Sequence, residues 1–534
     1  MRADQITLPL YTQVATGSPA LWQRGLRLAL LLALAALYGV AMAYLPPQLV
    51  VLPIVPIAVL LLLALWLLPD RTTFPERTLI ASFTWFIALY YLWPSYVAIA
   101  LPGLPWFSAG RLGLFVLILV ALYCSSISSV FRRRMLETAQ ASPVIWALLL
   151  TELVAQTLAT LLTRQPITAA TKFANDQMYW TLPFFVGCFI FSKPGRVTSF
   201  ARTMVIIVVT LSICGFLEHA QQKLFWEGHI PSFLKVDNDQ LLGAVFSGQA
   251  REYFGTYRVH STFSVSLIYA ELLVLVLPFV LHWMVTAKTL KLRLTMIAAW
   301  LLIVPNIMFT DSRLGKIGFI IAHIGYALMA ALRARARKAT FATSAAVVAI
   351  PVIALMLLSL IFASHTLHSM VFGSEGYAGS TNARYDQLAM GIPKILSNPL
   401  GYGAGTSGVV LGYRDPAGLL TIDSQYLKTT LESGVIGMLA TYGVFLWAAW
   451  LALRMYFTSR DPEVELAGPT ALLLVIYVVI KGVLAEDYNN TLGYIAVAMV
   501  AALAARCYPR WQHVPGAIGA QKRLGRAALQ SAQA

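Results

Sequence analysis

Long apolar stretches recur along the whole chain and lead to the first prediction. Fourteen of them lie near residues 26–45, 48–68, 79–102, 112–131, 142–163, 177–192, 199–217, 264–285, 294–310, 314–332, 342–363, 433–455, 466–485 and 489–505. Most approach the length of about 20 residues that a helix needs to cross a bilayer. Their apolar residues are continuous, without the alternation of a barrel strand, and lipid offers no hydrogen-bond partners to an exposed backbone. The sequence therefore predicts an all-α transmembrane helix bundle, as a single membrane domain over residues 1–534.

Two connections between the predicted spans are much longer than the rest, at 218–263 and 364–432. Connections of this length are uncommon in compact domains and usually carry a function. Because successive spans alternate in direction, both loops fall on the same side of the membrane. We therefore expect the functional residues in these two external loops.

The second long loop contains a helix and a turn that its sequence predicts. Ser380 or Thr381 can cap a helix that starts near Asn382, and its apolar spacing places one face along the membrane surface. Pro393 is expected to kink this helix. The glycine-rich run at 398–405 then predicts a turn whose backbone could approach a ligand closely.

Composition and charge narrow the class of protein. The chain is 58% hydrophobic and only 12% charged, which excludes a set of soluble domains that would each need a polar surface. A net charge of +16 would suggest nucleic acid in a soluble protein. Here, however, basic residues gather in alternate connections, at 132–134, 193–196, 288–293, 333–338 and in the tail 506–534. This positive-inside pattern predicts cytoplasmic termini and a tail that is attracted to anionic lipid, not to nucleic acid.

Three arginines on the predicted external side are candidates for substrate binding. Arg258 ends the first long loop, Arg313 occupies a short turn between two spans, and Arg384 lies at the start of the predicted loop helix. A guanidinium group suits phosphate because it offers two parallel donors. Taken singly, each arginine could instead be a salt-bridge partner or a snorkelling anchor. Three arginines on one surface favour an anion site.

Other charges near or within the predicted spans have two interpretations. Asp311 lies close to Arg313 in the chain, so an internal ion pair and an anion site fit this turn equally well. Glu152, Glu271 and Lys481 fall inside predicted spans, where burial of charge is costly. Each of these three could belong to a structural pair.

The sequence contains no recognised cofactor motif. It has no histidine and cysteine cluster at zinc spacing, no phosphate-binding loop and no nucleophile elbow. An enzyme built on this chain is therefore expected to work without a metal, a nucleotide or another cofactor.

Three segments together resemble a known family. Residues 384–437, which include the glycine-rich run and the motif Asp423-Ser424-Gln425-Tyr426-Leu427, look like the signature loop of the bacterial O-antigen ligase and polysaccharide polymerase superfamily. Ser312-Arg313 with Gly315 resembles the Ser-Arg turn of that family, and residues 258–263 resemble its pre-helix segment. The resemblance extends over residues 250–440 in order.

The resemblance implies a function. Members of the family transfer a sugar chain from a polyprenyl diphosphate lipid to an acceptor hydroxyl, without metal, on the periplasmic face of the bacterial inner membrane. By the resemblance, Arg313 and Arg384 hold the donor diphosphate together with Arg258, and stabilise the charge that it gains in the transition state. The expected partners are a polyprenyl-diphosphate-linked oligosaccharide, membrane lipid, and a flippase and chain-length regulator of the same pathway. Nucleic acid is not expected.

One motif departs from the family pattern. Where ligases of the family carry His-Asn, this chain has Asp423-Ser424. Asp423 can still accept a proton from the attacking hydroxyl or orient it, although a helix N-cap alone also fits. The predicted catalytic residues are Asp423, Arg384 and Arg313. The departure favours a polymerase that joins lipid-linked repeat units into O-antigen, capsule or exopolysaccharide. A ligase is the alternative, and a transporter or lipid flippase is the alternative from another class.

Overall fold

The structure is a computed structural model, and it describes residues 74–100, 106–236, 239–246, 257–364, 368, 378–415 and 418–507. The first two predicted spans, 26–45 and 48–68, lie outside the described residues, as does the tail from residue 508. The chain divides into two compact units, one formed by residues 1–76 and 121–132 and the other by residues 77–120 and 133–534. Every site discussed below belongs to the second unit.

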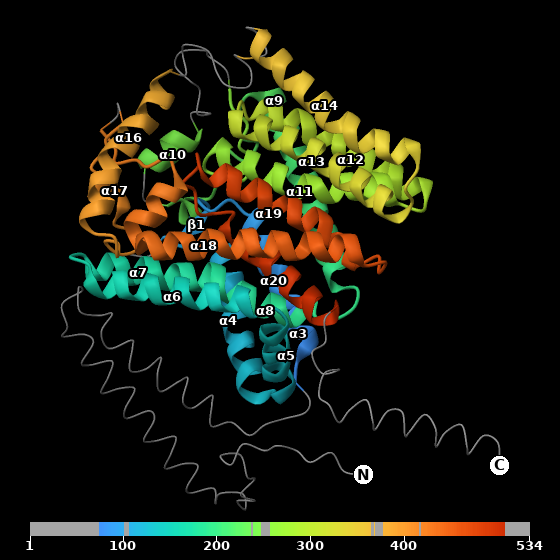
Figure 1. The fold of residues 1–534 in the computed structure, drawn as a ribbon. Coiled ribbons are helices and arrows are strands. Elements are labelled where there is room, and N and C mark those ends of the chain that lie inside the picture. Colours follow the sequence, from blue (N-terminus) through green and yellow to red (C-terminus); the bar gives the residue numbers. More distant parts are fainter. Residues whose placement is uncertain are drawn as a thin grey trace, which may run out of the picture. The chain divides into compact units, whose positions relative to one another are not determined.

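Helices make up nearly all the regular structure of the described residues (Figure 1). They are α3 (Glu76–Leu92), α4 (Ala109–Ile127), α5 (Ser129–Ala141), α6 (Pro143–Leu162), α7 (Pro166–Asp176), η3 (Gln177–Thr181), α8 (Leu182–Phe191), α9 (Arg196–Gln221), η4 (Ser232–Leu234), α10 (Asp239–Phe246), α11 (Ser266–Thr286), α12 (Leu290–Phe309), α13 (Arg313–Arg337), α14 (Phe341–Ala363), α16 (Ala378–Ser397), α17 (Ser407–Leu411), α18 (Gln425–Thr458), η6 (Val464–Leu466), α19 (Ala467–Lys481) and α20 (Asn490–Cys507). The strands β1 (Ala98–Ile99) and β2 (Phe107–Ser108) pair antiparallel, with Ala98 opposite Ser108. The predicted all-α class is confirmed.

Ten helices in the described part of the chain are long and apolar enough to cross a membrane, namely α4, α6, α9, α11, α12, α13, α14, α18, α19 with η6, and α20. A multi-pass membrane protein is therefore confirmed. The predicted span 177–192 corresponds to η3, a π-helical turn, followed by the short α8. The predicted span 79–102 is wrong at its end, because α3 stops at Leu92. Pro94 cannot donate a backbone hydrogen bond and disfavours a helical conformation in the residue before it.

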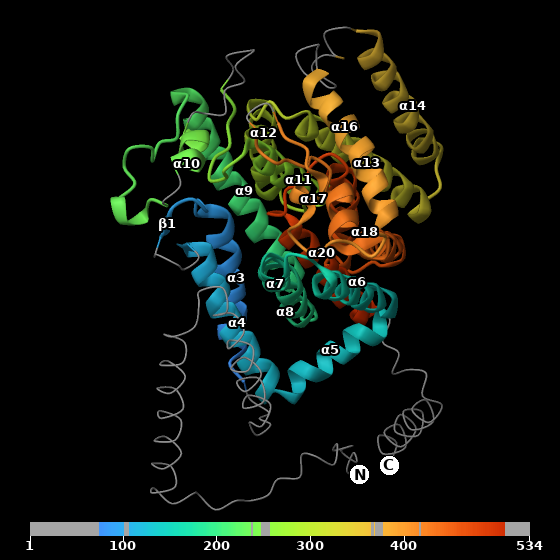
Figure 2. The ribbon, with the colours of Figure 1, turned by 90° about the vertical axis from the view of Figure 1, so that its left-hand side faces the viewer.

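Helix α11 lies in the core of the second unit. Nearly all of its residues from Ser266 to His282 are buried, and it packs against α9, α12, α13 and α19 (Figure 2). Helix α18 packs along α6 and α19, and α20 packs on α8. A helix with neighbours on every side must be apolar around its whole circumference. The sequence of α11 meets this condition with few exceptions, and the main one is Glu271.

A buried ion pair fastens α11 to α19. The Nζ atom of Lys481 lies 2.9 Å from Oε1 of Glu271, and both side chains are fully buried. Asn489 donates to the other Glu271 oxygen at 2.9 Å. The predicted structural pairing is thus confirmed for Glu271 and Lys481. Glu152, by contrast, accepts hydrogen bonds from Tyr494 and Gln156.

The glycine-rich run after α16 packs on a break in α18. Gly434 interrupts this helix with φ 75° and ψ 178°, a conformation that is essentially restricted to glycine. The amide of Tyr402 donates to the carbonyl oxygen of Leu431 at 2.8 Å. A Cβ atom on Gly401 would lie 2.5 Å from the Gly434 nitrogen. The sequence predicted a close approach of this run to a ligand, whereas the approach at Gly401 is to the backbone of α18.

Candidate functional site

Arg258 lies beside the turn that carries Arg313. The Arg258 side chain is buried, and its Nε donates to the carbonyl oxygen of Thr310 at 3.0 Å. The amide of Val259 donates to the carbonyl oxygen of Phe309 at 3.1 Å. Arg313, half-buried, is the first residue of α13 and follows its N-cap, Ser312. Two predicted site arginines from distant parts of the sequence thus come from adjoining backbone segments.

The acidic residue of this turn has a partner that the sequence did not single out. Asp311 adopts a left-handed conformation, with φ 42°. Its Oδ1 lies 3.2 Å from Nζ of Lys316, which is on the first turn of α13. Lys316 therefore belongs to the charged surroundings of Arg313.

A carboxylate at the end of α9 holds the Arg258 segment in place. Glu218 accepts hydrogen bonds from the amides of His260, at 3.0 Å, and Ser261, at 2.7 Å, and from the hydroxyl of Tyr257, at 3.0 Å. Burial lowers the pKa of His260, so this ring is neutral at pH 7. Sequence reasoning missed Glu218, although a lone acid at the end of an apolar helix is a usable signal.

Arg384 and Asp423 form an ion pair between α16 and the start of α18. The Arg384 Nε atom lies 3.6 Å from Asp423 Oδ2, and each side chain is about one-third exposed. The amide of Asp423 donates to Oε1 of Gln387 at 2.8 Å. The N-cap of α18 is Ser424, whose hydroxyl accepts from the Leu427 amide. The expectation that Asp423 caps this helix is therefore wrong, and its carboxylate instead faces a guanidinium group.

A polar cavity of about 350 Å³ lies at the ends of several helices, and the sequence did not predict it. Its walls come from the α3–α4 connection, α7 and η3, the segment before α11, the first turn of α18 and the α19–α20 connection. Ser264 links this wall to the Arg258 segment, and Lys428 links it to the segment of Asp423. Arg258, Arg313, Arg384 and Asp423 do not themselves line this cavity. In the described part of the chain, the structure brings Arg258 beside the turn of Arg313 and Arg384 beside Asp423, as two separate groups.

A network of lysines and aspartates occupies one side of this cavity. Oδ2 of Asp487 lies 2.5 Å from Nζ of Lys428 and 3.1 Å from Nζ of Lys172. Lys172 also forms an ion pair with Asp176. Burial disfavours the charge of Asp487, but the two ammonium groups outweigh it and hold the pKa of Asp487 well below its usual range.

Asp176 has the opposite electrostatic balance. Burial, together with the nearby charge of Asp487, raises the pKa of Asp176 to about 7, against the effect of Lys172. The network therefore combines one carboxylate that stays ionised with one that exchanges a proton near neutral pH. Sequence reasoning missed it, although an acidic pair, Glu486-Asp487, between two closely spaced predicted spans was a visible signal.

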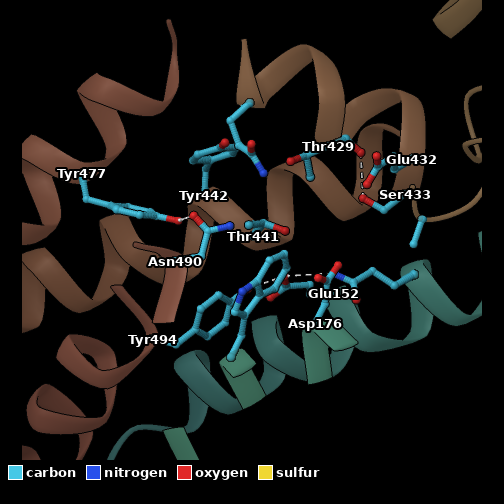
Figure 3. Close-up of a pocket in the computed structure, with 14 residues that line it drawn as sticks. Glu152, Asp176, Thr429, Glu432, Ser433, Thr441, Tyr442, Tyr477, Asn490 and Tyr494 are labelled. Atoms are coloured by element: carbon cyan, nitrogen blue, oxygen red, sulfur yellow. Dashed lines mark hydrogen bonds between the residues drawn. The ribbon is translucent and has the colours of Figure 1, made fainter. Parts of the chain in front are cut away.

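A second, smaller cavity of about 30 Å³ is drawn in Figure 3. It adjoins the first, since Asp176 and Trp180 line both. Glu152 and Asp176 reach it from one side, and Tyr477 and Asn490 from the other. The Tyr477 hydroxyl donates to Oδ1 of Asn490 at 2.7 Å. A space of this size holds about one water molecule, so it extends the polar network without room for a substrate.

The described residues contain no group of three or more His, Cys, Asp or Glu side chains that could hold a metal ion. The chemistry available in this part of the chain consists of guanidinium groups, carboxylates with contrasting protonation, and aromatic rings. Such groups can bind an anion, orient a hydroxyl and accept its proton.

Part of the chain matches a known protein family. Residues 297–442 match a family model described as O-antigen ligase. The matched segment contains Arg313, Arg384 and Asp423, whereas Arg258 and Asp487 lie outside it. No curated protein matches the chain.

Proposed function

We propose that this multi-pass membrane protein polymerises lipid-linked oligosaccharide repeat units. The proposal takes as its premise that the chain belongs to the O-antigen ligase superfamily and acts in glycan transfer. The donor is an oligosaccharide on a polyprenyl diphosphate, and the product is O-antigen, capsule or exopolysaccharide. The reaction takes place on the periplasmic face of the inner membrane. The reaction needs no nucleotide, because the donor sugar is already attached to a good leaving group, the polyprenyl diphosphate.

The proposed reaction is a displacement at the anomeric carbon of the donor. The acceptor hydroxyl oxygen forms the new glycosidic bond, the bond from the anomeric carbon to the diphosphate oxygen breaks, and polyprenyl diphosphate leaves with the electron pair. The hydroxyl proton passes to the carboxylate of Asp423. Arg258, Arg313 and Arg384 bind the diphosphate, and their fixed charges stabilise it most when its own charge increases in the transition state.

The observation that carries this proposal is the pairing of Arg384 with Asp423. It supports the assignment because Arg384, which would bind the leaving diphosphate, lies next to Asp423, which would take the proton of the attacking hydroxyl. Both side chains are about one-third exposed, so a substrate can reach them. The 3.6 Å separation is too long for a hydrogen bond, and both groups keep capacity to bind other partners.

Ligation is the second candidate, because the matching family model is described as O-antigen ligase. A ligase would transfer a finished glycan to a lipid acceptor and would not lengthen it. The two activities are separable by product. A polymerase makes long chains from lipid-linked repeat units alone, whereas a ligase needs the acceptor and leaves the chain length unchanged.

The test is reconstitution of the full chain in liposomes with lipid-linked repeat units, without nucleotide or metal, followed by sizing of the product. Arg313→Ala, Arg384→Ala and Asp423→Asn should each lower the rate by about 10²-fold to 10³-fold, as the loss of one transition-state contact does in other enzymes. Arg414→Ala is the control, since this exposed arginine lies in the same loop and donates to the Gly418 carbonyl. Long polymer at the normal rate in both arginine variants would reject the assignment.

A further inference from the structure

The 350 Å³ cavity has the dimensions of a small-molecule site and an aromatic wall. Four aromatic side chains on its lining are half-buried or exposed: Trp93, Tyr179, Trp180 and Tyr488. Of these, Trp180 is already stacked on Tyr494. The Trp93 side chain is 37% exposed although its Nε1 donates to the Val97 carbonyl at 2.7 Å. Tyr488 stacks on Tyr90 with ring centroids 4.3 Å apart. Fixed rings of this kind are ready to receive a flat, partly apolar surface.

Charge on the cavity lining argues against a diphosphate as its ligand. The described lining residues include two cations, Arg111 and Lys428, and three carboxyl groups, Asp176, Glu486 and Asp487. Lys428 is already engaged by Asp487 at 2.5 Å. A lining with this balance offers no excess positive charge to an anion, in contrast to the three arginines.

The same lining also argues against a lipid tail. A hydrocarbon chain would exclude water from these charged side chains and offer them no hydrogen bond in return, which is costly. A sugar combines the two features that this lining offers. Its ring has an apolar C–H face that stacks on an aromatic ring, and its hydroxyls both donate and accept hydrogen bonds.

We propose that this cavity, between Trp93, Tyr179 and the Lys428–Asp487 pair, is a saccharide-binding subsite that holds sugar residues of the substrate. The proposal rests on the proposed function, since it takes the saccharide from the substrate of that reaction. Ser264 lines the cavity six positions after Arg258, and Lys428 lines it five positions after Asp423. The cavity wall thus includes residues from the same two chain segments that carry Arg258 and Asp423.

Individual side chains have distinct roles in this subsite. Trp93 and Tyr179 provide ring faces. Asp487 is engaged by Lys428 and Lys172 at Oδ2 and by Gln425 and Asn490 at Oδ1, and so fixes the charge and shape of this wall. The Asp176 carboxyl, with its raised pKa, can donate a proton to a hydroxyl oxygen as well as accept one. Arg111, exposed and held by the Trp106 carbonyl at 2.6 Å, closes the rim.

The test measures binding of two soluble probes to the full chain in detergent by titration calorimetry. One probe is the free repeat-unit oligosaccharide, released by mild acid from the lipid carrier of the source cells, and the other is inorganic pyrophosphate. Trp93→Ala should weaken oligosaccharide binding by about tenfold or more and leave pyrophosphate binding unchanged. Arg313→Ala and Arg384→Ala should have the opposite effect.

Two variants guard against a loss of folding. Trp93→Phe keeps a ring face and should retain most of the oligosaccharide affinity. Trp85→Ala removes a tryptophan of α3 that is 65% exposed and does not line the cavity, and should bind both probes as the unmodified chain does. Equal oligosaccharide affinity in Trp93→Ala and in the unmodified chain overturns the proposal, as does loss of pyrophosphate binding in Trp93→Ala alone.

The donor and the acceptor are two sources of the same sugar chemistry, and competition separates them. If saturating lipid-linked donor displaces the free oligosaccharide, the subsite holds the sugar of the donor. If the oligosaccharide still binds, the subsite holds the acceptor. Failure of the proposed function is distinguishable, because normal polymer in the arginine variants rejects the reaction while the Trp93 comparison still decides the subsite.

Discussion

Single carboxylates in this protein owe their chemistry to the charges beside them. Asp487 lies against two lysines and stays ionised, whereas Asp176, more deeply buried and next to that negative charge, holds its proton to higher pH. Asp423 faces one guanidinium group near solvent. All three residues are aspartates and would have the same pKa in water, so the differences between them come from their surroundings.

The raised pKa of Asp176 predicts a pH-dependent stability. Its pKa is about 7 in the folded chain and about 3.9 in an unfolded chain. Between these values the folded state binds the proton more tightly, so this group stabilises the fold at low pH and the contribution is lost as pH rises toward 7. Thermal unfolding in detergent from about pH 5 to pH 8 should show a smaller decrease in melting temperature for Asp176→Asn than for the unmodified chain.

A matched control is Glu137→Gln, which removes a carboxyl from an exposed ion pair with Arg133. It should keep the pH dependence of the unmodified chain. If Asp176→Asn and the unmodified chain lose stability in parallel, the titration of Asp176 does not contribute.

At the scale of elements, a break in one helix positions the loop that carries the predicted chemistry. Helix α18 is interrupted at Gly434, and the glycine-rich run after α16 fits against this point by backbone hydrogen bonds from Tyr402, Gly403 and Val435. The break allows carbonyl groups of α18 to bond outside the helix. The loop is therefore anchored by backbone contacts close to Asp423, which only residues without a side chain permit.

Gly434→Ala should destabilise the protein by at least about 1–3 kcal/mol, because alanine is strained in this backbone conformation. Its Cβ atom would also lie 2.4 Å from the Pro399 carbonyl oxygen. Gly443→Ala is the control within the same helix, since its Cβ would meet the Leu148 side chain at 3.4 Å, an ordinary contact. Thermal unfolding measures both, and an equal effect of the two substitutions would contradict the role of the break.

At the scale of the whole molecule, the candidate chemistry lies where helices begin or end. The turn of Arg313 separates α12 from α13, Asp423 precedes α18, and Asp487 connects α19 with α20. Contacts link some of these connections: Lys428, near the start of α18, pairs with Asp487, and Arg258 donates to Thr310 beside the turn of Arg313. The basic residues Arg335 and Arg337 lie at the other end of α13 from Arg313. The proposed orientation places that basic end in the cytoplasm.

Cysteine labelling tests this orientation. In a chain whose cysteines Cys124, Cys188, Cys214 and Cys507 are replaced by serine, Arg414→Cys should react with a membrane-impermeant maleimide in intact spheroplasts. Arg133→Cys, at a side chain that is 68% exposed, should react only after permeabilisation. The reverse pattern would place the arginines on the cytoplasmic side and contradict the proposed periplasmic site.

The structure also shows how far prediction could go at each scale. The twelve predicted spans from residue 79 onward each correspond to a described helix, because their apolar length leaves no other stable form in lipid. The pairs Arg258 with Thr310 and Arg384 with Asp423 were not predictable, because each joins segments from different helices. The lysine–aspartate network was missed for the same reason, as Lys172 and Asp487 meet only when α7 approaches the α19–α20 connection.

The sequence by itself determined the helical class, the membrane as solvent and the resemblance to a family, since these depend on composition, local periodicity and short motifs. Only the tertiary structure decided which charges meet, which carboxylate holds its proton, and where a cavity with aromatic walls opens. Electrostatic and packing energies act over a few ångströms. These energies therefore depend on which helix ends become neighbours in space, and this cannot be read from the order of residues along the chain.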